Sequence, residues 1–325
     1  MAQGKSQLDS SPQIYIDGRI VARPEAAVSV FDAGFQSGDA VWEGLRLYQR
    51  VVFRLSAHLE RLEASARALR IVLPLDREHM MEAVYQIIDA NHFTDGIHLR
   101  LIVTRGERST SGMDPTTAPP RGSLIIIPEP KPVVADPAPL TLATSPIRRS
   151  RPDVLDPTIH HANQLNSILA RLSAQDANAD AALMLDADGF VAEADTANIF
   201  CVTDGAVLTP RPRACIRGIT RGAVIALGRR LGYDVREGDL HLHEFYSASE
   251  VFLVGTLSEL VPVSAVDGRC IGDGAPGPVW RDLLSAYRHL VVEECAAELH
   301  TLGTRVADSR RAAAVASTLP PSGLR

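Results

Sequence analysis

Lysine is almost absent from this chain of 325 residues, which contains only Lys5 and Lys131 although lysine and arginine together number 33. Chemistry that needs a neutral amine as a nucleophile therefore has very few candidates, because the arginine guanidinium stays protonated in water. Lys5 lies in a leader that we expect to be flexible, and Lys131 lies in a proline-rich segment. Any activity of this chain has to be compatible with that shortage.

The chain also has few cysteines, and they do not occur in the closely spaced pairs that would suggest a metal site. We expect free thiols and no metal. No run of about 18 apolar residues is present, and the first residues lack the apolar core of a signal peptide. The net charge of −6 is spread along the chain, which argues against nucleic acid as a partner. These absences favour a cytoplasmic protein that acts on small molecules, without a membrane or nucleic-acid partner. The cysteines are Cys201, Cys215, Cys270 and Cys295.

The first part of the chain has the pattern of a small α/β domain over residues 1–130. Asp17-Gly18 is a two-residue turn signal and predicts a hairpin over 13–21. Ser56 is the expected N-cap of the helix that follows, because apolar residues recur after it at helical spacing. After this helix we expect a second helix at 76–91, followed by strands at 97–104 and 123–129.

Prolines then mark a linker over 131–139, since they remove backbone donors and stiffen an extended chain. Many short strands with interspersed helices favour a barrel-like α+β domain over 140–302 rather than a doubly wound sheet. Residues 303–325 lack periodicity and are predicted to be a disordered tail. Because 46% of the residues are hydrophobic, two proper cores are feasible. The predicted fold class is α/β, in the α+β sense, with two domains.

Several segments occur together in the order and spacing of one enzyme family. Over roughly residues 13–290 the chain resembles the class IV aminotransferases, the fold-type IV pyridoxal-phosphate enzymes. This family includes branched-chain and D-amino-acid aminotransferases, aminodeoxychorismate lyase and R-selective amine transaminases. The resemblance implies a homodimer, pyridoxal or pyridoxamine 5'-phosphate as cofactor, and an amino donor and a keto acid as substrates. The segments are VSVFDAGFQSGDAVWEGLRLY, HLERL, GFVAEADTANIF, IRGITR and VGTLSELVPVSAVDG.

The resemblance assigns residues to the two ends of the cofactor. Arg61 in HLERL matches an arginine that grips the phosphate through paired donors. The N–H groups of Ile219 and Thr220 in GITR open a helix and point at the same anion, and Thr256 also reaches it. Glu193 matches the glutamate beside the pyridine nitrogen, where an opposite charge favours the protonated ring.

The residue that binds the cofactor covalently in the family is missing. IHHAN stands where relatives have patterns such as Ile-Lys-His-Leu-Asn. Counting back from Asn163 places His160 in the slot of the lysine, whereas a spacing longer by one residue selects Ile159, and neither is an amine. We therefore expect non-covalent retention of the cofactor. Lys131 reaching in from the linker is the alternative.

His160 and His161 are the catalytic candidates, because a neutral imidazole is suited to moving protons near neutral pH. If this segment is a strand, alternation turns only one of them toward the cofactor. A general acid/base contributes roughly 10² to 10⁴ in rate, so the expected activity is slow but finite.

Other positions of the pocket also depart from the family. Gln164 replaces a frequent tyrosine near the phenolic oxygen of the cofactor, and Asn198 lies in the same segment as Glu193. We count Gln164 and Asn198 among the cofactor-binding residues. The substrate-binding candidates are Trp42, His98, Arg100, Arg105, Arg108, Leu257 and Ser258.

Three hypotheses follow from these residues and the resemblance. The first is an aminotransferase that works without a catalytic lysine. The second is a catalytically inactive protein that binds pyridoxal or pyridoxamine phosphate. The third is a lyase similar to aminodeoxychorismate lyase, which IHHANQL resembles locally.

Overall fold

The computed structural model describes residues 11–318, with side chains described for residues 11–300. A six-stranded antiparallel sheet forms the first half of the chain, with the strand order β2-β1-β6-β5-β3-β4. Its elements are β1 (Ile14–Ile16), β2 (Arg19–Val21), α1 (Ala33–Ser37), β3 (Ala40–Tyr48), β4 (Val51–Val52), α2 (Leu55–Ala68), α3 (Arg77–Ala90), β5 (Ile97–Thr104) and β6 (Ser123–Pro130), with single 3-10 turns at Arg23–Glu25 and Pro115–Thr117.

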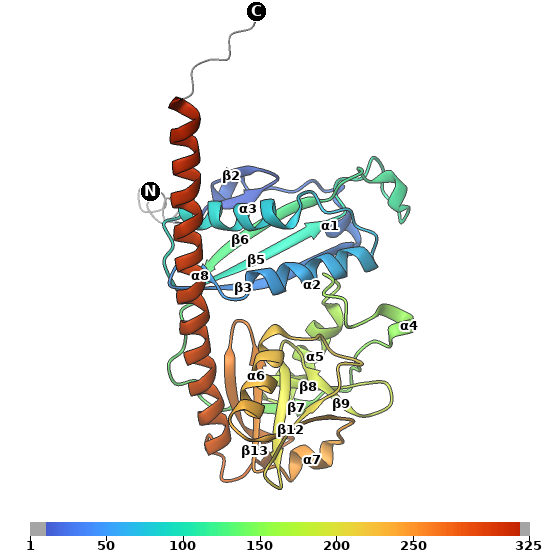
Figure 1. Cartoon of the computed structure of the whole chain (residues 1–325). Coiled ribbons are helices and arrows are strands. Elements are labelled where there is room, and N and C mark those ends of the chain that lie inside the picture. The colour runs from blue at the N-terminus through green and yellow to red at the C-terminus, as the bar shows by residue number, and fades with distance from the viewer. Residues whose placement is uncertain (1–10, 319–325) are drawn as a thin grey trace, which may run out of the picture.

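Two helices cover one face of this sheet, as Figure 1 shows for α2 and α3. Their apolar faces supply Leu59 and Leu62 from α2 and Val84 and Ile87 from α3, all fully buried in one core cluster with residues of β3 and β5. Such a helix-on-sheet layer is the expected way to bury one apolar face of each element.

The predicted elements of this half are confirmed apart from one boundary. The hairpin at 13–21 and the helix at 76–91 are present, and the side chain of Asp76 accepts a hydrogen bond from the His79 N–H at the start of α3. Ser56 is not the N-cap of α2. The N-cap is Arg54, two residues earlier, in a left-handed conformation with φ 54°, and the helix begins at Leu55, which is buried in the core.

The second half contains a nine-stranded sheet in the order β12-β11-β10-β13-β14-β7-β8-β9, with β15 paired to β14. The sheet curls, so β9 also lies beside β10, and the Ala194 N–H donates to the Ala197 carbonyl. The predicted barrel-like architecture is therefore present. The elements are β7 (Leu140–Thr144), α4 (Pro152–Leu155), α5 (Leu165–Asp176), β8 (Ala181–Leu185), β9 (Val191–Ala194), β10 (Asn198–Thr203), β11 (Ala206–Pro210), α6 (Ile219–Arg230), β12 (Asp234–Gly238), α7 (Leu242–Tyr246), β13 (Glu250–Gly255), β14 (Glu259–Val266), β15 (Arg269–Cys270) and α8 (Pro278–Thr318).

The long helix α8 runs beside both halves of the molecule (Figure 1). Trp280, Leu283 and Tyr287 of α8 are buried in a core cluster that also contains Tyr48 and Phe53 from the first half. One apolar cluster thus joins the two halves and fixes the cleft between them.

The predicted linker and the predicted tail can be compared with the observed elements. β6 ends at Pro130 and β7 begins at Leu140, and the segment between them forms no helix or strand. The division into 1–130 and 140–302 remains our interpretation. A disordered tail was expected at 303–325, but in the structure α8 continues as far as Thr318. Residues 319–325 lie outside the described residues. Within residues 11–318, no helix is both long and apolar enough to span a bilayer.

Candidate active site

A cavity of about 340 Å³ lies between the two halves of the chain. Its size is in the range of small-molecule sites. Strands β3 and β5 border it from the first half. From the second half it is lined by the segment before α5, the end of β9, the start of α6 and the turn after β13. Both halves are therefore needed to form it.

His160 lies in a segment that is pinned to β3. The Trp42 N–H donates to the His160 carbonyl at 3.0 Å, and the Ala162 N–H donates to the Ala40 carbonyl at 2.8 Å. The His160 N–H donates to Ser65 Oγ at 3.1 Å. These contacts fix the backbone and leave the imidazole on the wall of the cavity.

His161 is also among the residues that line the cavity. The segment forms only an isolated bridge, from Val41 to His161, and not a regular strand, so strict alternation does not apply. His161 is buried, and its Nδ1 has no hydrogen-bond partner among the described residues. Burial, together with the nearby Arg149, lowers the pKa of His161.

Glu43 is fully buried beneath His160, and its carboxylate is contacted by Arg61, His58 and His160. Arg61 donates to both carboxylate oxygens, from Nε at 2.8 Å and from Nη2 at 2.6 Å. His58 Nδ1 lies 2.7 Å from Oε2, and His160 Nδ1 lies 3.2 Å from Oε1. Burial opposes ionisation, but the contacts with His160 and Arg61 outweigh it and hold the pKa of Glu43 well below its usual value.

Arg61 and the start of α6 line one part of the cavity. Arg61 also donates to the Arg217 carbonyl at 3.0 Å, just before the helix. Gly218 caps α6 without a side-chain hydrogen bond, and the N–H groups of Ile219 and Thr220 have no protein acceptor in the described part of the chain. Unpaired donors at a helix N-terminus beside a guanidinium fit a phosphate. Thr256 lines the same cavity.

Glu193 lies on the cavity wall at the end of β9 and is buried. Arg149 Nη2 lies 2.9 Å from its Oε1, and Asn198 Nδ2 donates to its Oε2 at 3.1 Å. Burial raises the pKa of Glu193 to about 7, and Arg149 opposes that rise. Asn198 also donates to the Ile216 carbonyl at 3.1 Å, which connects this carboxylate to the loop before α6.

The outer wall of the cavity carries cations. The Arg100 guanidinium lies 4.1 Å above the Trp42 ring, whose other neighbour is the His160 ring at 4.3 Å. Lys131 lines the cavity too, with its Nζ 2.9 Å from Glu129. His98 is buried beside it, and burial together with the Lys131 charge lowers the pKa of His98 to about 4. This wall can therefore attract an anion.

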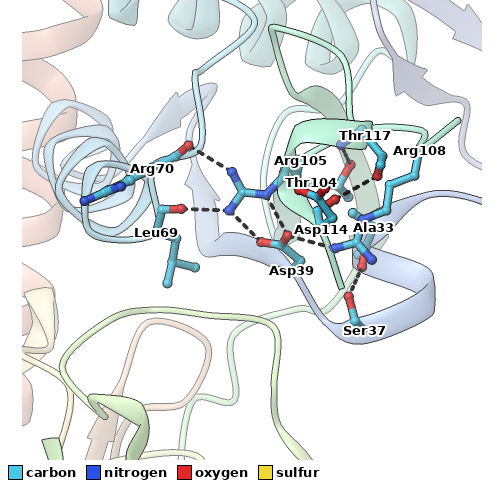
Figure 2. A network of polar contacts seen from close by, with 12 residues as sticks. Ala33, Ser37, Asp39, Leu69, Arg70, Thr104, Arg105, Arg108, Asp114 and Thr117 are labelled. Carbon is cyan, nitrogen blue, oxygen red and sulfur yellow. Dashed lines mark hydrogen bonds and ion pairs between the residues drawn. The ribbon is translucent and has the colours of Figure 1, made fainter. Parts of the chain in front are cut away.

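Two of the substrate candidates lie away from the cavity of their own chain. Figure 2 shows Asp39 between the guanidinium groups of Arg105 and Arg108, at 2.6 Å from Arg105 Nε and 3.2 Å from Arg108 Nη2. Arg105 also donates to the carbonyl of Leu69 at 2.7 Å. Neither arginine lines the cavity, because the loop after β5 turns them toward Asp39.

The remaining predicted residues are close to the cavity. Gln164 lines it, with Nε2 donating to the His161 carbonyl at 2.7 Å. Leu257 also lines it, whereas Ser258 is the next residue along the turn and is not part of the lining. Lys5 lies outside the described residues.

Sequence reasoning missed Glu43, His58 and Arg149. Glu43 follows Trp42 on a strand, and its burial was not signalled by the local pattern of polar and apolar residues. His58 lies three residues before Arg61 on α2, a helical spacing that puts both side chains on one face. That spacing is the signal that would have found His58. Arg149 had no signal, since it lies in an irregular segment.

The comparisons with known proteins agree on one family. Residues 40–266 match the family described as Amino-transferase class IV. The chain is 45% identical over 277 residues to Branched-chain-amino-acid aminotransferase-like protein 2 of Arabidopsis thaliana, covering 85% of this chain and 50% of that protein. It is 38% identical over 279 residues to a putative branched-chain-amino-acid aminotransferase of Methanocaldococcus jannaschii, covering 86% of this chain and 96% of that protein.

The chain belongs to the class IV aminotransferase family. A solved structure of this family, the T.th. branched-chain amino acid aminotransferase with pyridoxamine 5'-phosphate, matches with a TM-score of 0.82 and 31% identity, covering 86% of this chain and 94% of that one. The chain spans about half the length of the Arabidopsis relatives that it matches. The class IV fold is thus shared at the level of both sequence and structure.

Proposed function

We propose that this protein transfers an amino group between an amino acid or primary amine and a keto acid, through pyridoxal and pyridoxamine 5'-phosphate held without a covalent bond to the chain. The observation that supports this most directly is a cavity with an anion site at one end and a buried carboxylate at the other, while His160 lies on its wall between Trp42 and Glu43. A neighbouring class IV structure contains pyridoxamine 5'-phosphate, which has no carbonyl to bind a lysine.

The residues present fit this cofactor. The unpaired N–H groups of Ile219 and Thr220 would hold the phosphate, together with Thr256 and the Arg61 hydrogens that Glu43 and the Arg217 carbonyl leave free. Glu193 would face the ring nitrogen, where its ionised form favours the pyridinium. When bound, the ring withdraws electrons from the carbon that carries the amino group. Gln164 and Asn198 are the further proposed contacts on this side of the cavity.

His160 would carry the proton that the family's lysine otherwise moves. It lies on the cavity wall, and its backbone is fixed by Trp42 and Ser65. His161 lines the same cavity and is the second candidate. Without a lysine the protein also lacks fast exchange of one bound amine for another, so we propose slow turnover.

The substrate would enter along the outer wall. Arg100, held over Trp42, has no hydrogen-bond or ion-pair partner among the described residues and would receive a substrate carboxylate. His98 and Leu257 line this side. We leave Arg105 and Arg108 out of the proposed substrate site because Asp39 binds both. Ser258 stays a candidate for binding the substrate carboxylate, but only through its backbone N–H group.

We also propose a homodimer in the cytoplasm. An apolar stripe at helical spacing is exposed on α5, in a chain whose other large helices bury such faces. A second copy would cover it. All four cysteines are free thiols, which suits a reducing compartment. The stripe consists of Leu165, Ile168, Leu169 and Leu172.

The test is a single half-reaction. Purified protein loaded with pyridoxal phosphate is mixed with D- or L-amino acids or R-amines, and pyridoxamine phosphate and the keto product are quantified. We expect both products in equal amounts from at least one donor. Pyruvate or an aromatic product without pyridoxamine phosphate would indicate lyase chemistry. Tight cofactor binding with no product from any donor would contradict the proposal and indicate a binding protein.

A further inference from the structure

One buried carboxylate joins the anion-binding end of the cavity to the position of the missing lysine. Glu43 Oε1 contacts both Arg61 Nε, at 2.8 Å, and His160 Nδ1, at 3.2 Å. Its Oε2 contacts Arg61 Nη2 at 2.6 Å and His58 Nδ1 at 2.7 Å. The side chain of Glu43 is fully buried, so no solvent competes for these oxygens.

The chemistry of these contacts determines where the proton on His160 lies. An ionised carboxylate only accepts hydrogen bonds and has about four lone-pair sites, which Arg61, His58 and His160 fill. A contact from Nδ1 of an imidazole to this carboxylate is therefore a hydrogen bond only if Nδ1 carries the hydrogen. In a neutral imidazole the other nitrogen, Nε2, is then an unprotonated base.

The surroundings keep that imidazole neutral. The titratable and charged groups that face His160 are Glu43 from β3, Arg61 and His58 from α2, and the adjacent His161. Burial lowers the pKa of His160, Arg61 and His58 act in the same direction, and Glu43 opposes them without reversing the shift. This direction favours the uncharged ring, the form in which one nitrogen stays free as a base.

The free nitrogen has access to the cavity. The His160 side chain retains 16% exposure, in contrast to the complete burial of Glu43. Its ring packs on Trp42 with centroids 4.3 Å apart, and its Nε2 contacts no polar group of the described chain. The only polar anchor of the ring among the described residues is the one to Glu43.

We propose that Glu43 is a positioning residue that holds His160 in the tautomer with hydrogen on Nδ1 and so presents Nε2 as the base of the reaction. This inference rests on the proposed function. Nε2 would accept the proton from the substrate carbon that bears the nitrogen, and Nε2–H would return the same proton on the cofactor's side of that nitrogen, so His160 ends in its starting tautomer. The cofactor, when bound, would supply the electron sink for the pair left on the substrate carbon. One water would be released as the amine condenses and one taken up at product release, so no oxidant is required.

The decisive experiment reads the tautomer directly. ¹⁵N NMR of histidine-labelled, cofactor-free protein distinguishes a protonated Nδ1 from a protonated Nε2, and the His160→Gln variant identifies the His160 signals among the 10 histidines. We expect hydrogen on Nδ1 in the wild type at neutral pH. In Glu43→Gln the amide donates as well as accepts, so we expect a shift toward hydrogen on Nε2.

A matched variant separates this effect from general disturbance of the cluster. His58→Gln keeps a donor toward Glu43 Oε2 at a contact that does not involve His160. We expect its His160 tautomer to match that of the wild type. Thermal unfolding of each variant shows whether it folds. If Glu43→Gln fails to fold, the wild-type tautomer alone still decides, because hydrogen on Nε2 or an imidazolium would overturn the proposal.

A kinetic measurement links the tautomer to the reaction. At saturating cofactor, Glu43→Gln should slow the half-reaction about 10- to 100-fold, part of the roughly 10² to 10⁴ that a general base contributes. The inflection of its pH–rate profile should move to lower pH, because Glu43 raises the basicity of His160. An unaltered tautomer or an unaltered profile in Glu43→Gln overturns the inference. The expected tautomer with no half-reaction in the wild type would instead refute the proposed function, and with it the catalytic part of this inference.

Discussion

Two neighbouring parts of the cavity wall differ in how closely they follow the class IV pattern. In one part, formed by α2, α6 and β9, Arg61, the helix N–H groups and Glu193 are of the kinds that a phosphate and a pyridine ring need. In the other part, on a segment attached to β3, lies His160, which we propose to take the place of the family's lysine. In this proposal, holding the cofactor and moving a proton fall to different residues, and one of these tasks can change while the other is kept.

Glu43 is the connection between these two parts. It forms an ion pair with Arg61 in one and contacts His160 in the other. The comparison predicts that variants of His160 affect the reaction rate. Variants of the residues proposed to hold the phosphate should affect the affinity for the cofactor and the stability of the fold. Only changes at Glu43 should affect the rate, the affinity and the stability together.

The largest expected effect is that of His160→Ala on rate. If His160 moves the proton, its removal should slow the half-reaction roughly 10²- to 10⁴-fold while the affinity for pyridoxal phosphate stays nearly the same. Single-turnover absorbance measures the first and fluorescence titration the second. His243→Ala, an exposed histidine on α7, is the control. If His161→Ala slowed the half-reaction to this extent and His160→Ala did not slow it, His161 would be the residue that moves the proton.

The register of the segment is tested by the reverse change. His160→Lys places an amine on the cavity wall, so we expect a covalent bond with pyridoxal phosphate, seen as a new absorption band and as a cofactor adduct on that peptide after borohydride reduction. If Ile159→Lys gains the adduct and His160→Lys does not, Ile159 and not His160 occupies the position of the family's lysine.

Arg61→Leu should break the anion-binding end. Removing one partner of a buried ion pair costs about 3 to 5 kcal/mol of unfolding free energy, because Glu43 is left without its cation. Loss of a charged hydrogen bond of about 1.5 to 3 kcal/mol should weaken cofactor binding roughly 10- to 150-fold. Urea unfolding and fluorescence titration measure these. Arg67→Leu, an exposed arginine on the same helix, should change neither. Unchanged affinity in Arg61→Leu would remove Arg61 from the phosphate site.

Glu193 should make stability depend on pH in the cofactor-free protein. Its folded-state pKa of about 7 lies above the model-compound value of 4.5, so the folded state keeps a proton that the unfolded chain has released. The unfolding free energy should then fall as pH rises through this window, by at most about 3 kcal/mol. Urea unfolding from pH 4.5 to 7 should show a flatter curve for Glu193→Gln. Identical slopes would contradict the raised pKa.

The smallest effect is expected at the arginines outside the cavity. Arg105→Gln removes contacts with Asp39 and two carbonyls, and should lower the unfolding free energy by about 1 kcal/mol without changing KM. Arg100→Gln, its counterpart on the cavity wall, should raise KM for substrates with a carboxylate. A raised KM in Arg105→Gln would return that residue to the substrate site.

The sequence predicted most of the fold because hydrophobic periodicity and turn residues act locally. The hairpin at Asp17-Gly18 and the helix capped by Asp76 follow from such local rules. The parallel pairing of β7 with β8 and β14 did not follow, since it joins residues far apart in the chain. The start of α2 was missed by two residues, because Arg54 in a left-handed conformation takes the N-cap position and Leu55 is buried in the core.

The candidate site was predictable where a motif has a fixed shape. HLERL and GITR bring Arg61, Ile219 and Thr220 together in the lining of one cavity. Glu43 was not predictable, because its role arises from contacts with α2 and with the His160 segment that only the folded chain brings together. The place of the loop arginines outside this cavity was not predictable for the same reason, since it follows from their contacts with Asp39.

The most direct test of a cofactor held without a covalent bond is borohydride reduction of the protein loaded with pyridoxal phosphate, followed by mass spectrometry of its peptides. We expect one cofactor bound per cavity before reduction and no adduct on any peptide after it. Lys131 lines the cavity and is the residue on which the opposite result would fall. A stoichiometric adduct on the Lys131 peptide would contradict the account.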